Sequence, residues 1–201
     1  MKLSALLVLL MSTMATHTMA QGRVWSIGPE LGINFSKYGQ DAASNDFKPG
    51  LIAGGFLTYS IENTHAFTGK ILFTQKGTKF SNDNQQTLNY VEVPLIARIF
   101  FNREGVFRPN LFVGPSVAFL TGAATKVGEN KPVSITNYRD QFNPVDFGIT
   151  GGLGLNFLIA TETRILFDFR YTHGLTDITK SNNAVINNQA LAITAGVSFG
   201  L

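Results

Sequence analysis

The hydrophobic residues near the end of the chain occupy every second position. In residues 191–201 every odd-numbered residue is apolar, and the even-numbered residues between them are small or weakly polar. A period of two predicts a β-strand. Because the second face carries small residues and no charge, it suits the narrow interior of a closed barrel better than bulk water.

The same alternation occurs seven more times along the chain. The eight predicted strands are residues 24–36, 50–61, 66–78, 89–101, 110–120, 145–157, 163–171 and 191–201. The second segment is blurred by Ile52 and Phe56 on its polar face. This pattern predicts an all-β fold, an eight-stranded antiparallel up-and-down transmembrane β-barrel.

The predicted connections alternate in length. The short ones are residues 62–65, 102–108 and 158–162, and the long polar ones are residues 37–48, 79–88, 121–143 and 172–188. Short turns on one side and long loops on the other are typical of bacterial outer-membrane barrels. With eight strands both termini fall on the short-turn side, so we expect the termini in the periplasm and the four long loops outside the cell.

The size of the apolar side chains decides which face points outward. Most apolar-face positions are Val, Ile, Leu, Phe, Tyr or Trp, and none is charged. An eight-stranded barrel holds only modest side chains or one small ligand, so the bulky face must lie against lipid. Trp25, Leu95 and Phe167 are therefore expected to point outward. A soluble lipocalin-like carrier, the competing closed-barrel interpretation, requires the opposite assignment.

Nine charged residues fall on the predicted lumen face, and we expect them to form an ion-pair network: Glu30, Lys70, Lys76, Glu92, Arg98, Asp146, Arg164, Asp168 and Arg170. Unpaired charges in so narrow a space would each cost several kcal/mol, so pairing across the lumen would plug it. The alternative is a small-solute pore lined by the same charges.

The first residues have the features of an export signal. Lys2 precedes an apolar run over residues 3–11, and small residues stand before Gln21. Residues 1–20 are predicted to be a cleaved signal peptide, because the apolar run is about half the length of a transmembrane helix. Residues 21–201 then form one barrel domain in the outer membrane of a Gram-negative-type bacterium.

Composition removes several classes of function. The chain has no cysteine, and after residue 20 its only histidines are His65 and His173, so neither a metal site nor a cofactor is expected. Without Lys2 it carries 15 basic and 13 acidic side chains, a net charge of +2 that gives no reason to expect nucleic acid. The expected partners are outer-membrane lipid and lipopolysaccharide, with a cell-envelope protein at the long loops, around a monomeric barrel.

Two patterns could indicate an enzyme. Residues 148–154 are rich in glycine but lack the lysine and the helix of a phosphate-binding loop. His173 suggests a lipid-modifying enzyme, yet Gly174 and Leu175 follow it, where a lipid A deacylase has a serine two residues after its histidine. No nucleophile is fixed by spacing, so we predict no catalytic residues and keep the lipid-modifying enzyme as an alternative.

Several short motifs resemble the PorT-like outer-membrane β-barrel family, at matching order and spacing over nearly the whole chain after residue 20. They are residues 28–35 (GPELGINF), 75–77 (QKG), 90–95 (YVEVPL), 111–115 (LFVGP) and 170–175 (RYTHGL). The resemblance implies a barrel of OmpX size and a non-enzymatic surface or secretion-associated interaction protein. It brings no catalytic residues. One departure is the terminal Leu201, where such barrels often end in an aromatic residue.

Overall fold

The computed structural model describes residues 25–40, 45–61, 63–80, 83–181 and 185–201. The predicted signal peptide, residues 1–20, lies outside them. Eight long strands dominate the described chain: β1 (Trp25–Gln40), β3 (Lys48–Ile61), β4 (His65–Phe80), β5 (Gln85–Phe100), β6 (Phe107–Lys126), β8 (Val145–Ala160), β9 (Thr163–Gly174) and β10 (Ile186–Gly200). Three short elements lie in the loops: β2 (Asn45–Asp46), β7 (Val133–Ser134) and α2 (Tyr138–Gln141).

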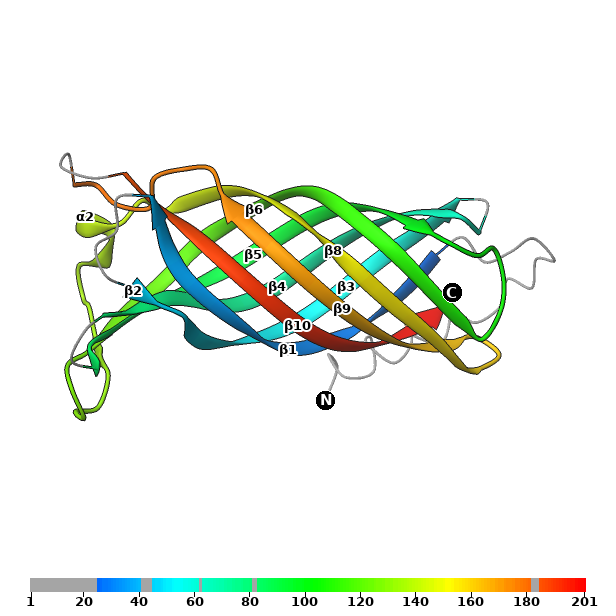
Figure 1. Ribbon diagram of the computed structural model, residues 1–201, viewed down its shortest axis with the longest axis horizontal. Coiled ribbons are helices and arrows are strands. Elements are labelled where there is room, and N and C mark those ends of the chain that lie inside the picture. The colour runs from blue at the N-terminus through cyan, green and yellow to red at the C-terminus, as the bar shows by residue number, and fades with distance from the viewer. Residues whose placement is uncertain (1–24, 41–44, 62, 81–82, 182–184) are drawn as a thin grey trace, which may run out of the picture.

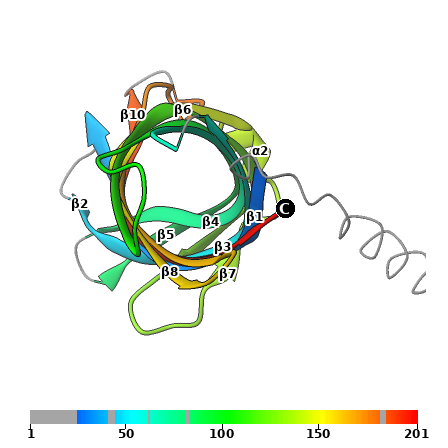
Figure 2. The same cartoon turned by 90° about the vertical axis from the view of Figure 1, so that its right-hand side faces the viewer.

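The eight long strands form a closed antiparallel barrel (Figures 1 and 2). Each long strand pairs with its neighbours in sequence, and β1 pairs with β10 to complete the ring. Ser26 faces Gly200 across this last ladder, and the Leu201 N–H donates to the Trp25 carbonyl at 3.0 Å. The predicted eight-stranded up-and-down fold is confirmed.

The two ends of the barrel differ. The short-turn end carries the three short connections and the last residue, at the right of Figure 1, and the long-loop end carries β2, β7 and α2, at the left. Strands extend further toward the long-loop end than predicted, and β6 continues to Lys126, opposite Gln85 of β5. The ladder continues there without apolar alternation, because outside lipid the outward positions have no need to be hydrophobic.

The apolar face points outward, as expected. The exposed fraction is 47% for Trp25, 58% for Leu95 and 38% for Phe167. Aromatic pairs on this surface include Trp25 with Tyr59, whose ring centroids lie 4.8 Å apart. The two residues that blurred the second strand, Ile52 and Phe56, point inward and are buried. Such a surface fits hydrocarbon around the barrel, since large contiguous apolar patches are rare on proteins surrounded by water.

Glycines on the inner face allow the tight curvature of a barrel this small. A Cβ on Gly54 would lie 2.1 Å from the Ile71 carbonyl oxygen, and one on Gly152 would lie 1.9 Å from that of Phe169. Side chains at these two positions would push neighbouring strands apart. Their backbones therefore approach closely because glycine has no Cβ.

In the described part of the chain, no helix is both long and apolar enough to cross a membrane.

Candidate functional site

Four charged side chains meet across the lumen, and we call them the central quartet: Glu30, Lys70, Arg98 and Asp168. The Lys70 ammonium donates to Glu30 Oε2 at 2.6 Å and to Asp168 Oδ2 at 2.9 Å. The Arg98 guanidinium holds the same Asp168 carboxylate with both terminal nitrogens, at 3.0 Å and 2.5 Å. All four side chains are buried. The quartet thus joins β1, β4, β5 and β9 across the barrel.

Arg98 has further partners that fix its position. Its Nε donates to Thr68 Oγ1 at 3.2 Å, its Nη1 donates to Asn110 Oδ1 at 2.9 Å, and its guanidinium lies 4.7 Å from the ring centroid of Phe112. A planar guanidinium suits such a site because its donors form a rigid fork. The charge that is removed from water is therefore compensated by a carboxylate and by neutral acceptors.

A second ion pair lies further toward the long-loop end. Between the two layers, Ile52, Leu72 and Ala192 form a small buried apolar cluster. Beyond it, Lys76 Nζ lies 3.3 Å from Glu92 Oε2, and Ser116 donates to the other oxygen of that carboxylate at 2.8 Å. The described residues of the lumen therefore include both ion pairs and apolar contacts.

The other three predicted network residues are placed differently. Asp146 accepts hydrogen bonds from Asn188 at 2.8 Å and Thr176 at 3.1 Å, and among the described residues no ion pair involves it. Arg170 is buried near Glu92 of the second ion pair, but its Nε and Nη1 have no hydrogen-bond partner within the described residues. Arg164 is half-buried at the short-turn end. The structure thus brings six of the nine residues into ion pairs.

An apolar cluster that the sequence analysis missed lies at the long-loop end, and we call it the apolar cap: Tyr38, Leu88, Tyr90, Ala118, Leu120, Ala123, Phe142 and Ile178. Phe142 and Ile178 come from two different long loops, and the Asn143 N–H donates to the Ile178 carbonyl at 2.9 Å. The signal in the sequence was weak, since each is a single large apolar residue within a polar loop. These two loops are therefore packed on each other and over the barrel.

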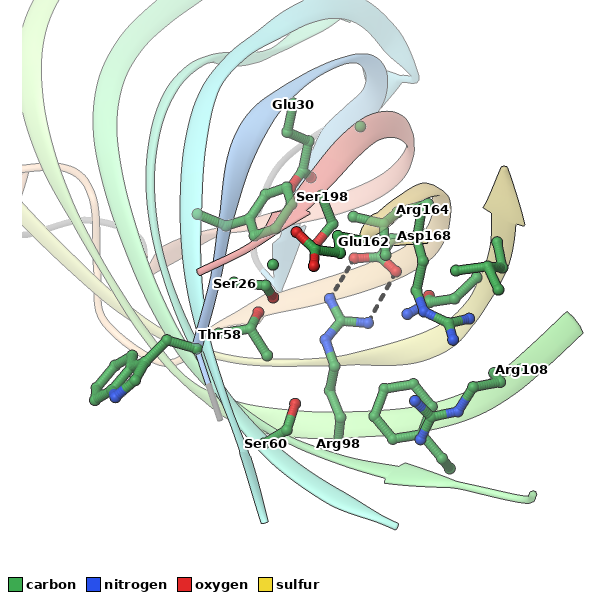
Figure 3. A pocket seen from close by; sticks show the side chains of 18 of the residues that line it. Ser26, Glu30, Thr58, Ser60, Arg98, Arg108, Glu162, Arg164, Asp168 and Ser198 are labelled. Atoms are coloured by element: carbon green, nitrogen blue, oxygen red, sulfur yellow. Dashed lines mark hydrogen bonds and ion pairs between the residues drawn. The ribbon is translucent and has the colours of Figure 1, made fainter. Parts of the chain in front are cut away.

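The short-turn end is open instead. A cavity of about 550 Å³ leads from this end to the central quartet, and we call it the vestibule (Figure 3). Hydroxyl groups line it, including those of Ser26, Thr58 and Ser198, and so do the apolar side chains of Phe56 and Leu166. Its lining stops at the level of the quartet. The vestibule is therefore open at the short-turn end, and the central quartet lies at its inner end.

The histidine considered for lipid chemistry lies on β9. Its Nδ1 is 3.3 Å from the Tyr171 hydroxyl, and within the described residues neither a serine nor a carboxylate is hydrogen-bonded to its ring. The same residues contain no group of three His, Asp or Glu side chains that could hold a metal ion. The arrangement around His173 therefore offers no pair of nucleophile and base.

Known proteins with a similar sequence or structure are outer-membrane β-barrels. A family model described as an outer membrane protein beta-barrel domain matches residues 19–180. The fold resembles Neisserial surface protein A, with 13% identity and a TM-score of 0.57, over 88% of this chain and 97% of that one. It also resembles the outer membrane protein OprG from Pseudomonas aeruginosa, with 12% identity and a TM-score of 0.55, over 89% and 96%. No curated protein matches the sequence.

Proposed function

The chain belongs to the outer membrane protein beta-barrel domain family, and on that premise we propose that it is a non-enzymatic surface or secretion-associated interaction protein with a plugged lumen. Its place is the outer membrane. The lumen charges act as structural cross-braces, and the long loops supply the contact surface. We assign the function to the loops and not to the barrel itself, because one fold can serve many roles and function depends on the sites that a fold carries.

The observation that supports this proposal is that buried side chains contact one another at two levels of the lumen. The central quartet joins strands near the middle, and the apolar cap packs barrel residues against two long loops at the long-loop end. A continuous water path would have to break the Lys70 and Arg98 contacts with Asp168 and also displace Phe142 and Ile178. Eight strands leave little spare width for such a path.

The difference between the two ends supports an orientation. Bacterial outer-membrane barrels place short turns in the periplasm and long loops outside the cell. On this basis the vestibule faces the periplasm, and β7, α2 and the apolar cap face the cell exterior. The connection between β6 and β8, predicted as residues 121–143, is the longest, and its Val133 is 69% exposed. This loop is the proposed contact surface.

Conductance tests the plug. The purified full chain, inserted into planar lipid bilayers, is expected to give no steady ion current. A channel with stable open levels would overturn the closed lumen and favour the small-solute pore.

Photo-crosslinking in cells tests the contact surface. A photoreactive amino acid at Val133 is expected to capture a cell-envelope protein, whereas one at Val106, 64% exposed in a short turn, should not give the same adduct. Recovery of lipopolysaccharide alone from Val133 would count against a protein partner. If the substitution His173→Ala changes the mass spectrum of lipid A, the result would instead support the alternative of a lipid-modifying enzyme.

A further inference from the structure

We propose that the vestibule is a binding site for a small organic anion whose phosphate or carboxylate group is held by Arg108 and Arg164. The ligand would approach from the short-turn end. This proposal is independent of what the long loops contact, because it concerns the opposite end of the barrel.

Two arginines lie together at the mouth of the vestibule. Arg108 is the second residue of β6 and Arg164 the second residue of β9. Both strands flank β8, where Asn156 faces Arg108 and Leu158 faces Arg164. The two positive charges are close enough to act on each other, and Figure 3 shows both side chains on the same side of the cavity. Like charges at such a site repel, so a structural purpose alone does not explain them.

Within the described residues, neither arginine is paired with a carboxylate as Lys70 and Arg98 are. Among the described residues no carboxylate forms an ion pair with either of them, although Glu104 adds a weaker attraction for Arg108. Arg108 Nε and Arg164 Nη1 are shielded from solvent and have no hydrogen-bond partner in the described part of the chain. Lys70 and Arg98, by contrast, are bound to acids. Unused donors on two adjacent guanidinium groups match the oxygens of a phosphate or carboxylate.

The inner end of the vestibule adds a second requirement for the ligand. Glu30 is buried, and while its Oε2 accepts from Lys70, its Oε1 has no hydrogen-bond partner among the residues that the structure describes. A carboxylate oxygen accepts hydrogen bonds and does not donate them, so a hydroxyl or amine of the ligand fits there. The anionic end would lie at the arginines and the donor end near Glu30.

The size and walls of the cavity limit the class of ligand further. A volume of about 550 Å³ lies in the range of sites for small molecules. Phe56, Phe100 and Leu166 supply apolar wall, and Ser26, Thr58 and Ser60 supply hydroxyl groups. The walls therefore suit a compact, partly apolar organic anion, and the cavity is too small for a folded protein segment.

One structural role of Arg108 must be separated from binding. Its guanidinium lies 4.2 Å from the Phe100 ring centroid, and its Nη2 donates to the Asn63 carbonyl in the turn between β3 and β4. Substituting Arg108 could therefore loosen the barrel. Arg164 has no such described hydrogen bond, so Arg164→Gln is the cleaner variant.

Titration calorimetry of the full refolded chain in zwitterionic detergent tests the site. The probes are phenyl phosphate, benzoate and the neutral benzyl alcohol. We expect one of the two anions to bind with a Kd below about 1 mM, and benzyl alcohol not to bind. Comparison of phenyl phosphate with benzoate shows which anionic group the arginines prefer.

Variants assign the binding to the arginines. Arg164→Gln should weaken binding of the anion at least about tenfold, as expected for loss of a charge-assisted contact, while Arg164→Lys keeps part of it. Arg139→Gln, at an exposed arginine of the long-loop end, should leave it unchanged. Each variant must keep the gel mobility of the folded barrel. Anion binding that is absent, or that is unchanged in Arg164→Gln, would overturn the proposal, as would equal binding of benzyl alcohol.

Discussion

Asp168 holds two cations at once inside the barrel. Its carboxylate accepts from Lys70 and, with both oxygens, from Arg98. Removing its charge would leave both cations in a medium of low dielectric constant with fewer acceptors. The loss of a partner is usually worse than the absence of the whole pair, because the remaining charge stays buried.

We therefore expect Asp168→Asn to lower the free energy of unfolding by about 3 to 5 kcal/mol, measured by urea titration of the barrel in lipid vesicles. The matched control is Asp140→Asn in the exposed α2, expected to change it by less than about 0.5 kcal/mol. Equal effects of the two substitutions would show that the central quartet does not brace the lumen.

At this scale the sequence predicted the direction of each charged side chain but not its partner. Alternation places Lys70 and Asp168 on the inner face. They are 98 residues apart, and their contact depends on strand tilt and stagger, which no single strand contains. That Arg164 forms no ion pair with a described residue was beyond prediction for the same reason.

Apolar contacts hold two of the long loops at their end of the barrel. Ile178, in the loop after β9, is fully buried in the apolar cap with Phe142. In the loop between β6 and β8, Ile135 and Tyr138 are only partly buried against the cap, and Lys131 and Arg139 are exposed. The loop should therefore open locally while the barrel stays closed.

Ile178→Ala is expected to remove about 2 to 5 kcal/mol of this local packing. Trypsin cleavage at Lys131 and Arg139 should then become more than about tenfold faster, with the barrel core left intact on the gel. Leu175→Ala, in the same loop but on an exposed residue, is the control. An unchanged cleavage rate in Ile178→Ala would mean that the apolar cap does not hold the loop between β6 and β8, which contains Lys131 and Arg139.

At the scale of elements, alternation located all eight barrel strands but not their ends toward the long loops. The extension of β6 to Lys126 lies in a sequence of small and polar residues, which does not alternate. Hydrogen bonding to β5 defines that end of the strand. The apolar cap was missed because it joins single residues from separate loops, and only their folding together makes a cluster.

The outer surface of the whole molecule is built for hydrocarbon. Leu95 lies midway along the apolar face of β5 and is 58% exposed, and Leu175 is 59% exposed just beyond the end of β9. The two side chains are thus equally accessible, but at different heights on the barrel. If the same substitution at the two positions changes the free energy of unfolding by different amounts, the cause is therefore contact with lipid and not a difference in exposure.

Leu95→Arg should lower the free energy of unfolding from lipid vesicles by about 2 to 4 kcal/mol, and Leu175→Arg by less than about 1 kcal/mol. Folding into vesicles, followed by urea titration, measures both. Equal and small effects would remove the lipid-facing assignment of this surface. At this scale the sequence was most informative, because side-chain volume alone decides which face fits inside eight strands.

The ladder between β1 and β10 also affects how the barrel folds and assembles. Every other long ladder joins strands that are neighbours in sequence, but this one brings Ser26 to Gly200. Hairpins can therefore form early, whereas the two outermost strands keep open backbone edges until the final step. A second copy could pair with such an edge, so ring closure competes kinetically with aggregation during assembly. Chaperones that keep newly exported chains apart until they reach the bilayer would favour ring closure over aggregation.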